Sequence, residues 1–226
     1  MSAIDKLIEI ANAEVGYLEK SSNSQLDSKT ANAGTANYTK YWRDIKPEYQ
    51  GQPWCACFVT WCFVNAFGID NAQKLLKHYP YVYCPTMANL FTLNANPTVG
   101  DIVIFKHNGT FTHTGIVTGV NGDYFTTIEG NTNGGSTIIA NGGRKGYYNS
   151  NLPGTKFCTP DYSIVEESED LTMSQYTELK ELIEKQAAEI ADLKNINKQL
   201  VNVVQTTMVY DFNDDNMPPW ARPAVQ

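Results

Sequence analysis

The chain has 226 residues, a formal net charge of −7 and 42% hydrophobic residues. Residues 1–165 contain twelve acidic and twelve basic side chains, whereas residues 166–226 contain twelve acidic and five basic ones, so the acidic excess lies in the C-terminal part. Nucleic-acid binding favours a basic patch, and no apolar run approaches the roughly eighteen residues of a membrane span. We therefore expect no nucleic acid and no membrane among the partners.

The N-terminus and the cysteine content both indicate the compartment in which the protein is made. Residues 1–5 lack the basic and apolar regions of a secretory signal peptide. The five cysteines are odd in number, which fits a reduced compartment better than a disulfide framework. We expect synthesis in the cytoplasm without a signal peptide, and action elsewhere only after release.

The N-terminal part of the chain predicts helices. Ser2 and Asp5 have the spacing of a capping box, and Gly16 ends the apolar face that follows them. Gly68 is expected to stop a second, mostly buried helix. The helices are expected at residues 2–15, 55–67 and 70–77, with a long polar loop at 19–40.

From Gly100 onward the pattern changes to strands rich in β-branched and aromatic residues. Strands are expected at 101–105, 114–120, 123–129, 136–140, 145–149 and near 162–165. Asn121-Gly122 is a strong hairpin signal between the second and third of them. Helices followed by strands predict an α+β fold with an antiparallel sheet.

The C-terminal part divides into an acidic linker at 166–173, a heptad helix at 174–206 and an acidic, Pro-rich tail at 207–226. The heptad positions are Tyr176, Leu179, Ile183, Gln186, Ile190, Leu193, Asn197, Leu200 and Val204. This spacing favours a coiled coil, with Asn197 fixing the register, and hence a homo-oligomer through residues 174–204. The alternative is a single amphipathic helix that folds back on the main domain.

Cys55 stands at the start of the second predicted helix, in the segment Pro53-Trp54-Cys55-Ala56-Cys57. The unpaired N–H groups and the positive dipole end of a helix favour a thiolate at this position. A thiolate nucleophile needs an imidazole, and the imidazole needs a third group that orients it. Cys55 is therefore a candidate nucleophile.

His113 and Glu129 are candidates for the other two groups. Each lies eight residues from Asn121, on either side of the predicted hairpin, so antiparallel pairing would bring them close together. Asn131 follows two residues later and could serve the same orienting purpose.

Two other interpretations remain open at this stage. A lone cysteine is most often a buried structural residue, and we assign that role to Cys57 and Cys62. A zinc site could be formed from Cys55, Cys57, Cys62, Cys84 and His78. However, the first two thiols would point roughly 200° apart on a helix, which is a poor arrangement for zinc ligands.

The ordered motifs Trp54-Cys55-Ala56-Cys57-Phe58, Gly100-Asp101-Ile102-Val103, His113-Thr114-Gly115-Ile116 and Ile128-Glu129-Gly130-Asn131 resemble the CHAP family of cysteine, histidine-dependent amidohydrolases/peptidases. The resemblance covers roughly residues 3–165 and implies a papain-like α+β fold, and residues 1–165 are taken as the catalytic domain. It implies Cys55 as the nucleophile, His113 as the base, and Glu129 and Asn131 as the residues that orient the histidine. The segment 47–53 has one acid, so we predict no calcium site there, and no other cofactor is expected.

The resemblance is to phage endolysins of Firmicutes type, which implies cleavage of an amide bond in bacterial peptidoglycan. The reaction would be that of an N-acetylmuramoyl-L-alanine amidase or a peptide-bridge endopeptidase, with Gln52 as a candidate oxyanion donor. The alternative is a phage structural or wall-attachment protein in which a CHAP-like module is held as an oligomer. Residues 214–223 also resemble the start of a surface-layer-homology-like wall-binding repeat.

Overall fold

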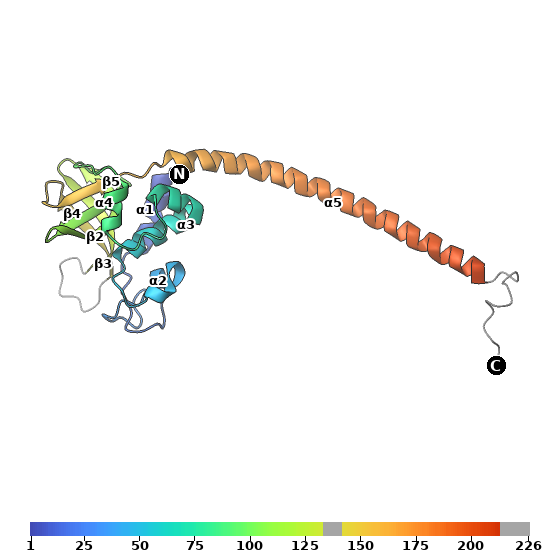
Figure 1. The fold of residues 1–226 in the computed structure, drawn as a ribbon, viewed down its shortest axis with the longest axis horizontal. Helices are drawn as coiled ribbons and strands as arrows, with labels where there is room; N and C mark the ends of the chain where they lie inside the picture. Colours follow the sequence, from blue (N-terminus) through green and yellow to red (C-terminus); the bar gives the residue numbers. More distant parts are fainter. Residues whose placement is uncertain (133–141, 213–226) are drawn as a thin grey trace. The chain divides into compact units, whose positions relative to one another are not determined.

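The computed structural model describes residues 1–132 and 142–212; for 167–176, 179 and 207–212 it describes the backbone alone. The chain divides into two compact units, Met1–Glu169 and Asp170–Gln226. The first unit contains the helices and the sheet that were expected for an α+β domain (Figure 1).

The helices of the first unit other than the start of α5 precede its strands in the chain. They are α1 (Ala3–Ala13), α2 (Lys40–Ile45), the 3₁₀ helix η1 (Pro47–Tyr49), α3 (Cys55–Leu76) and α4 (Pro85–Leu90). The capping box predicted for α1 is present: the Asp5 backbone N–H donates to Ser2 Oγ at 3.1 Å, and the Asp5 carboxylate accepts from the Ser2 backbone N–H. These two bonds satisfy N–H groups that the first turn of a helix leaves unpaired.

The helix α3 changes direction at Gly68, whose φ of 76° and ψ of 167° are not helical. The glycine therefore ends one helical segment and begins a second, as the sequence predicted, because a residue without Cβ adopts this backbone conformation at little cost. By length and apolar composition alone α3 could cross a membrane, but more than half of its apolar window is buried in the protein. Its apolar composition is explained by that burial.

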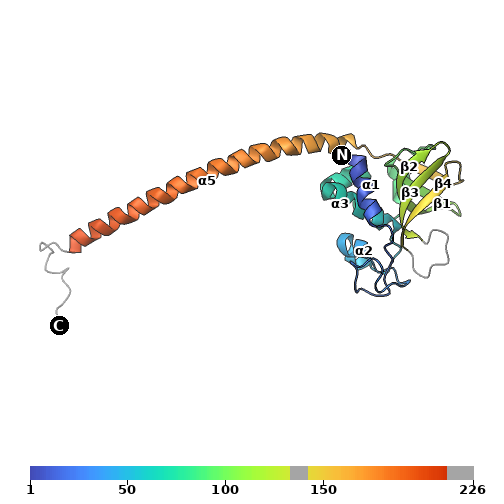
Figure 2. The same cartoon turned by 180° about the vertical axis from the view of Figure 1, so that it is seen from behind.

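In the part of the chain that the structure describes, five strands form one antiparallel sheet in the order β4-β3-β2-β1-β5. Figure 2 shows this sheet beside the helices α1 and α3. The strands are β1 (Ile102–His107), β2 (Thr110–Asn121), β3 (Tyr124–Thr132), β4 (Gly142–Asn149) and β5 (Thr155–Cys158). The predicted hairpin is confirmed, since Asn121 pairs with Tyr124 and Ile116 with Ile128. The α+β class with an antiparallel sheet and N-terminal helices is therefore confirmed.

Two of the expected strands need comment. The strand at 136–140 lies outside the described residues. The prediction of a strand near 162–165 is wrong, because a helix begins at Ser163. The Asp161 side chain caps this helix by accepting hydrogen bonds from the backbone N–H and the hydroxyl of Ser163. The fifth strand lies earlier, at Thr155–Cys158, where it pairs with β1.

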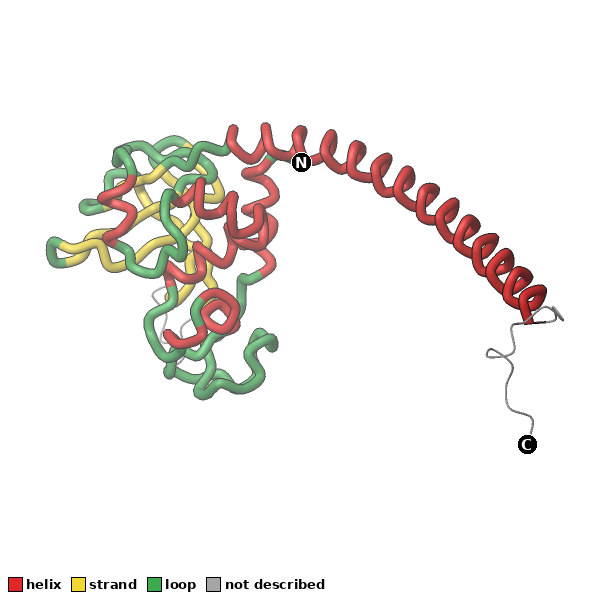
Figure 3. The backbone as a smooth tube through the Cα atoms, turned by 45° about the vertical axis from the view of Figure 1, so that its right-hand side comes forward, coloured by secondary structure: helices red, strands yellow, loops and turns green. Residues whose placement is uncertain are grey.

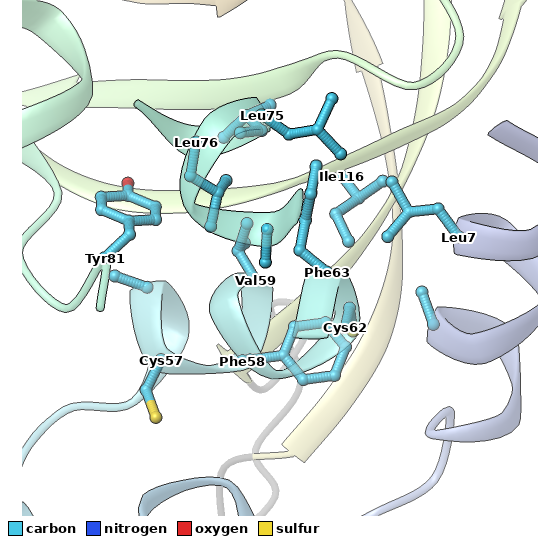
Figure 4. Packing of buried hydrophobic residues seen from close by; sticks show 14 of the residues in the cluster. Leu7, Cys57, Phe58, Val59, Cys62, Phe63, Leu75, Leu76, Tyr81 and Ile116 are labelled. Carbon is cyan, nitrogen blue, oxygen red and sulfur yellow. The ribbon is translucent and has the colours of Figure 1, made fainter. Parts of the chain in front are cut away.

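The main core lies between the helices and one face of the sheet. Figure 4 shows Leu7 of α1, Phe63 of α3 and Ile116 of β2 among its fully buried side chains. A smaller cluster of Val103, Val117, Phe125 and Phe157 covers the other face. Successive side chains of β1 point to opposite faces of the sheet, so Ile102 and Ile104 join the main core and Val103 joins the smaller cluster. All three are apolar because both faces of this strand are buried. This packing fixes α3 against the strands that carry the candidate site. The helix that carries the candidate nucleophile thus packs on the antiparallel sheet, against β2 and β3.

The helix α5 runs from Ser163 to Phe212 (Figure 3). It includes residues 166–173, which were expected to be a linker, and it continues six residues beyond the predicted end at 206. The expected linker is helical because it contains neither glycine nor proline, and Glu and Leu are good helix formers. The remaining tail, with its wall-binding resemblance, lies outside the described residues.

Candidate active site

Cys55 is the first residue of α3, directly after the N-cap residue Trp54. Trp54 is fully buried, its indole N–H donates to Glu19 Oε2 at 3.0 Å, and its ring stacks on Tyr41. The buried indole fixes the point at which α3 begins. Cys55 is thereby held where backbone N–H groups of the first helical turn face its sulfur.

His113 lies on β2, and its Nε2 atom is 2.8 Å from Oε2 of Glu129 on β3. The Glu129 side chain is buried and also accepts hydrogen bonds from the hydroxyls of Thr127 and Tyr148. Because Nε2 is engaged by the carboxylate, Nδ1 is the ring nitrogen left for Cys55. The proximity of His113 and Glu129, inferred from their positions about the hairpin, is confirmed.

A glycine makes this proximity possible. A Cβ atom built on Gly115 would lie 2.5 Å from Cγ of Glu129, which no side chain tolerates. Similarly, a Cβ atom on Gly130 would lie 2.6 Å from Cβ of Phe58 on α3. The absence of a side chain at Gly115 leaves room for the Glu129 side chain to reach His113. The absence of one at Gly130 lets α3 pack closely against β3.

The side chains of this group shift one another's protonation. Hydrogen bonding with Cys84 holds the pKa of Cys55 well below its usual value, and the hydrogen bond and charge of His113 act in the same direction against the effect of burial. Burial lowers the pKa of His113, but hydrogen bonds with Cys55 and Glu129 outweigh it and raise that pKa to about 10. Near neutral pH these shifts favour a thiolate beside an imidazolium.

Cys55 opens onto a cavity of about 570 Å³ with an opening to solvent. The lining residues are Trp42, Tyr49, Gln52, Pro53, Cys55, Val82, Tyr83, Cys84, Pro85, Thr110, Phe111 and Thr112. A cavity of this size with a few polar groups among apolar ones suits part of a peptide or sugar-peptide chain. Gln52, the candidate oxyanion donor, is exposed at its wall.

The remaining residues that the sequence analysis named as candidates lie in less favourable or different surroundings from those of Cys55, His113 and Glu129. Asn131 is partly buried near the end of β3, at an irregularity of the β3–β4 pairing, with φ of 58°. Cys57 is buried within α3, and burial raises its pKa well above the usual value. His78 and His107 are exposed. Among the side chains that the structure describes, no three of His, Cys, Asp or Glu gather as metal ligands would.

Sequence reasoning missed the part that Cys84 has in this site. Its Sγ lies 3.6 Å from Sγ of Cys55, although the two residues are 29 positions apart in the chain. The sequence offered Cys84 as a zinc ligand alone, and no local pattern indicated its position beside Cys55.

Residues 47–131 match the family model of the CHAP domain. The CHAP match contains Cys55, His113 and Glu129 and ends at Asn131, so all four predicted site residues lie within it. A search of the curated proteins found no match.

Two solved structures share a limited likeness with this chain. One is the crystal structure of Ly7917, with 14% identity and a TM-score of 0.39 over 71% of this chain and 63% of that one. The other is Ly7917 with the hydrolyzing product of MDP, with 14% identity and a TM-score of 0.38 over 70% and 62% of the two chains. This chain thus aligns with less than two thirds of the length of each.

Proposed function

We propose that this protein is a peptidoglycan hydrolase that cleaves an amide bond of the bacterial wall with Cys55 as its nucleophile. The observation that carries the proposal is the grouping of three side chains within the CHAP match. Cys55 stands at a helix N-terminus on an open cavity, and His113, whose Nε2 lies 2.8 Å from Oε2 of Glu129, acts to lower the pKa of its thiol. The pKa directions of the thiol and the imidazole are those of an activated nucleophile and its acid partner.

The reaction follows from these positions. The Cys55 thiolate attacks the amide carbonyl carbon, and the C–S bond forms as the carbonyl π electrons move to oxygen. Backbone N–H groups at the start of α3 stabilise this oxyanion, with Gln52 as a second donor. The His113 imidazolium gives its proton to the leaving nitrogen, and the C–N bond breaks to leave an acyl-enzyme. The now neutral imidazole takes a proton from water, whose oxygen attacks the acyl carbon and releases the product acid and the thiolate.

Glu129 acts through His113 in this scheme. Its buried carboxylate holds the ring by Nε2 and stabilises the imidazolium, which the first half-reaction consumes and the second forms again. Asn131 is proposed as a second orienting residue, on the basis of its resemblance to the family motif and its place two residues along the same strand.

The proposal is tested by adding the purified chain to a suspension of bacterial cell walls and following turbidity. The wild-type protein should clear the suspension, and Cys55→Ala should reduce the rate by at least about 10³-fold while its circular dichroism stays unchanged. Cys57→Ala is the matched control on the same helix and should clear walls. Equal clearing by wild type and Cys55→Ala would contradict the proposal.

Mass spectrometry of the digested walls would then identify the bond. New N-terminal alanine without a muramoyl group indicates an N-acetylmuramoyl-L-alanine amidase, whereas new termini within the bridge indicate an endopeptidase. The proposed role is that of a phage endolysin, made in the host cytoplasm and acting on the wall after release.

A second candidate function is wall attachment or a structural role in an oligomer, and α5 is the observation that favours it. Of the heptad positions with described side chains, the apolar ones Ile183, Ile190, Leu193, Leu200 and Val204 are each more than half exposed. A second copy of the same helix is the occupant that a heptad seam fits, because its positions are self-complementary. Binding to walls without clearing, by a protein that light scattering shows to be oligomeric, would favour this candidate over the hydrolase.

A further inference from the structure

Cys84 stands directly beside the candidate nucleophile. It is the N-cap residue of α4, and its Sγ is 3.6 Å from Sγ of Cys55. This distance is van der Waals contact between the two sulfurs, so a rotation of short side chains is enough to bring them to the roughly 2.05 Å of a disulfide. Both thiols line the same cavity, through which a small oxidant can reach them.

The remaining cysteines do not share this position. Cys57, Cys62 and Cys158 are fully buried, and the cavity wall contains Cys55 and Cys84 alone of the five cysteines, all of which lie in the described ranges. Burial raises the pKa of each of these three thiols, which keeps them protonated and unreactive. Oxidation of this protein should therefore be confined to one pair.

We propose that Cys55 and Cys84 form a site of reversible oxidation, in which a peroxide converts the two thiols into a disulfide that blocks the nucleophile. The blocking rests on the function proposed above, whereas formation of the disulfide does not. In the first step the Cys55 thiolate attacks one peroxide oxygen. An S–O bond forms, the O–O bond breaks, the sulfur is oxidised by two electrons, and the other oxygen takes a proton and leaves as water or an alcohol.

In the second step the sulfur of Cys84 attacks the sulfenic acid of Cys55. The S–S bond forms, the S–O bond breaks, and the departing hydroxide combines with the proton of the Cys84 thiol to leave as water. Two thiols and one peroxide thus give one disulfide, one water and one further water or alcohol. A dithiol such as dithiothreitol reverses the reaction by exchange and is itself oxidised.

The protonation of the pair sets the order of these steps. The pKa of Cys55 is held low, so Cys55 is the thiolate that meets the peroxide. The pKa of Cys84 is raised, first by its hydrogen bond with Cys55 and then by burial. Oxidation of Cys55 removes the thiolate that holds the Cys84 proton, so the second thiol becomes more reactive once the first has reacted.

The test uses the full chain, treated with hydrogen peroxide at about one equivalent and then digested without reduction. Peptide mass spectrometry should show a Cys55–Cys84 cross-link with the loss of two hydrogens, and dithiothreitol should remove it. Wall clearing should fall in proportion to the cross-link and return with the reductant. Cys84→Ala should form no cross-link: one equivalent of peroxide leaves Cys55 as the sulfenic acid, and a second equivalent converts it into sulfinic acid, which dithiothreitol does not reverse.

Cys158→Ala, in β5 and away from the cavity wall, is the matched control and should form the cross-link as the wild type does. The proposal is overturned if the wild type shows Cys55 sulfinic acid or unmodified Cys55 in place of the cross-link, or if Cys55 pairs with another cysteine. If the untreated protein clears no walls, the proposed function fails, while the mass measurement still decides whether the disulfide forms.

Discussion

The substitution Glu129→Gln removes one charge from the candidate site and leaves its shape almost unchanged. The amide oxygen of glutamine can still accept the His113 Nε2–H bond, and the Thr127 hydroxyl can turn to accept from the amide NH₂. What is lost is the negative charge that stabilises the imidazolium. The substitution therefore separates orientation of the histidine from its electrostatic support.

The size of the effect follows from the geometry. At the 2.8 Å between Nε2 and Oε2, two unit charges attract by about 6 kcal/mol at an effective dielectric of about 20. Because forming the pair also costs desolvation, measured hydrogen bonds to charged groups contribute only about 1.5–3 kcal/mol. At about 1.36 kcal/mol for each pKa unit, the pKa of His113 should fall by about one to two units.

The sign of the pH effect follows from the role of the imidazolium. A neutral His113 cannot donate a proton to the leaving nitrogen, so activity declines as pH rises through its pKa, which is raised to about 10 in the intact protein. Lowering this pKa moves the alkaline limb of the activity profile to lower pH by the same one to two units. The loss of activity should therefore be larger near pH 9 than near pH 7.

The assay is the initial rate of wall clearing against pH for the wild type, Glu129→Gln and Tyr148→Phe. The last variant is the matched control, since it removes a hydroxyl that donates to the same carboxylate oxygen at 3.2 Å and keeps the charge. Its alkaline limb should not move to lower pH. If the profile of Glu129→Gln coincides with that of the wild type, or moves to higher pH, the carboxylate does not support the imidazolium and the reasoning is wrong.

Three further predictions concern the assignment of roles and the C-terminal helix. Cys57→Ser should keep most of the wall-clearing rate, because this thiol is buried within α3 and its pKa is raised by burial; loss of activity with an intact fold would count against the assignment. In the same turbidity assay, His113→Ala should lower the rate by about 10³-fold, and Asn131→Ala should lower it by less. His107 is exposed, so His107→Ala should hardly change the rate. The reverse order of effects would exclude His113 as the acid–base residue. Deletion of residues 172–226 should leave a folded monomer that cleaves soluble wall fragments, because the candidate site lies upstream; a full-length chain that is monomeric by light scattering would refute the oligomer.

Short-range features of this protein were determined by the sequence. The capping box at Ser2 and Asp5, the break at Gly68 and the hairpin at Asn121-Gly122 each depend on the backbone preferences of residues close together in the chain. The hairpin in turn brought His113 and Glu129 together, because antiparallel pairing converts equal distances from a turn into spatial proximity. The strand expected near 162–165 failed for a local reason as well, since the cap at Asp161 outweighed the β-branched residues that follow.

Long-range contacts were decided by tertiary structure alone. The indole of Trp54 meets Glu19 across 35 positions of the chain, and the sulfurs of Cys55 and Cys84 meet across 29. No periodicity or turn signal relates such residues, because their distance depends on how α3, α4 and the sheet pack as a whole. Tertiary structure also explains why residue 115 is a glycine, because the Glu129 side chain occupies the space that a Cβ atom at this position would need. The sequence thus determined which residues are candidates for the reaction, and packing determined which thiol stands beside Cys55.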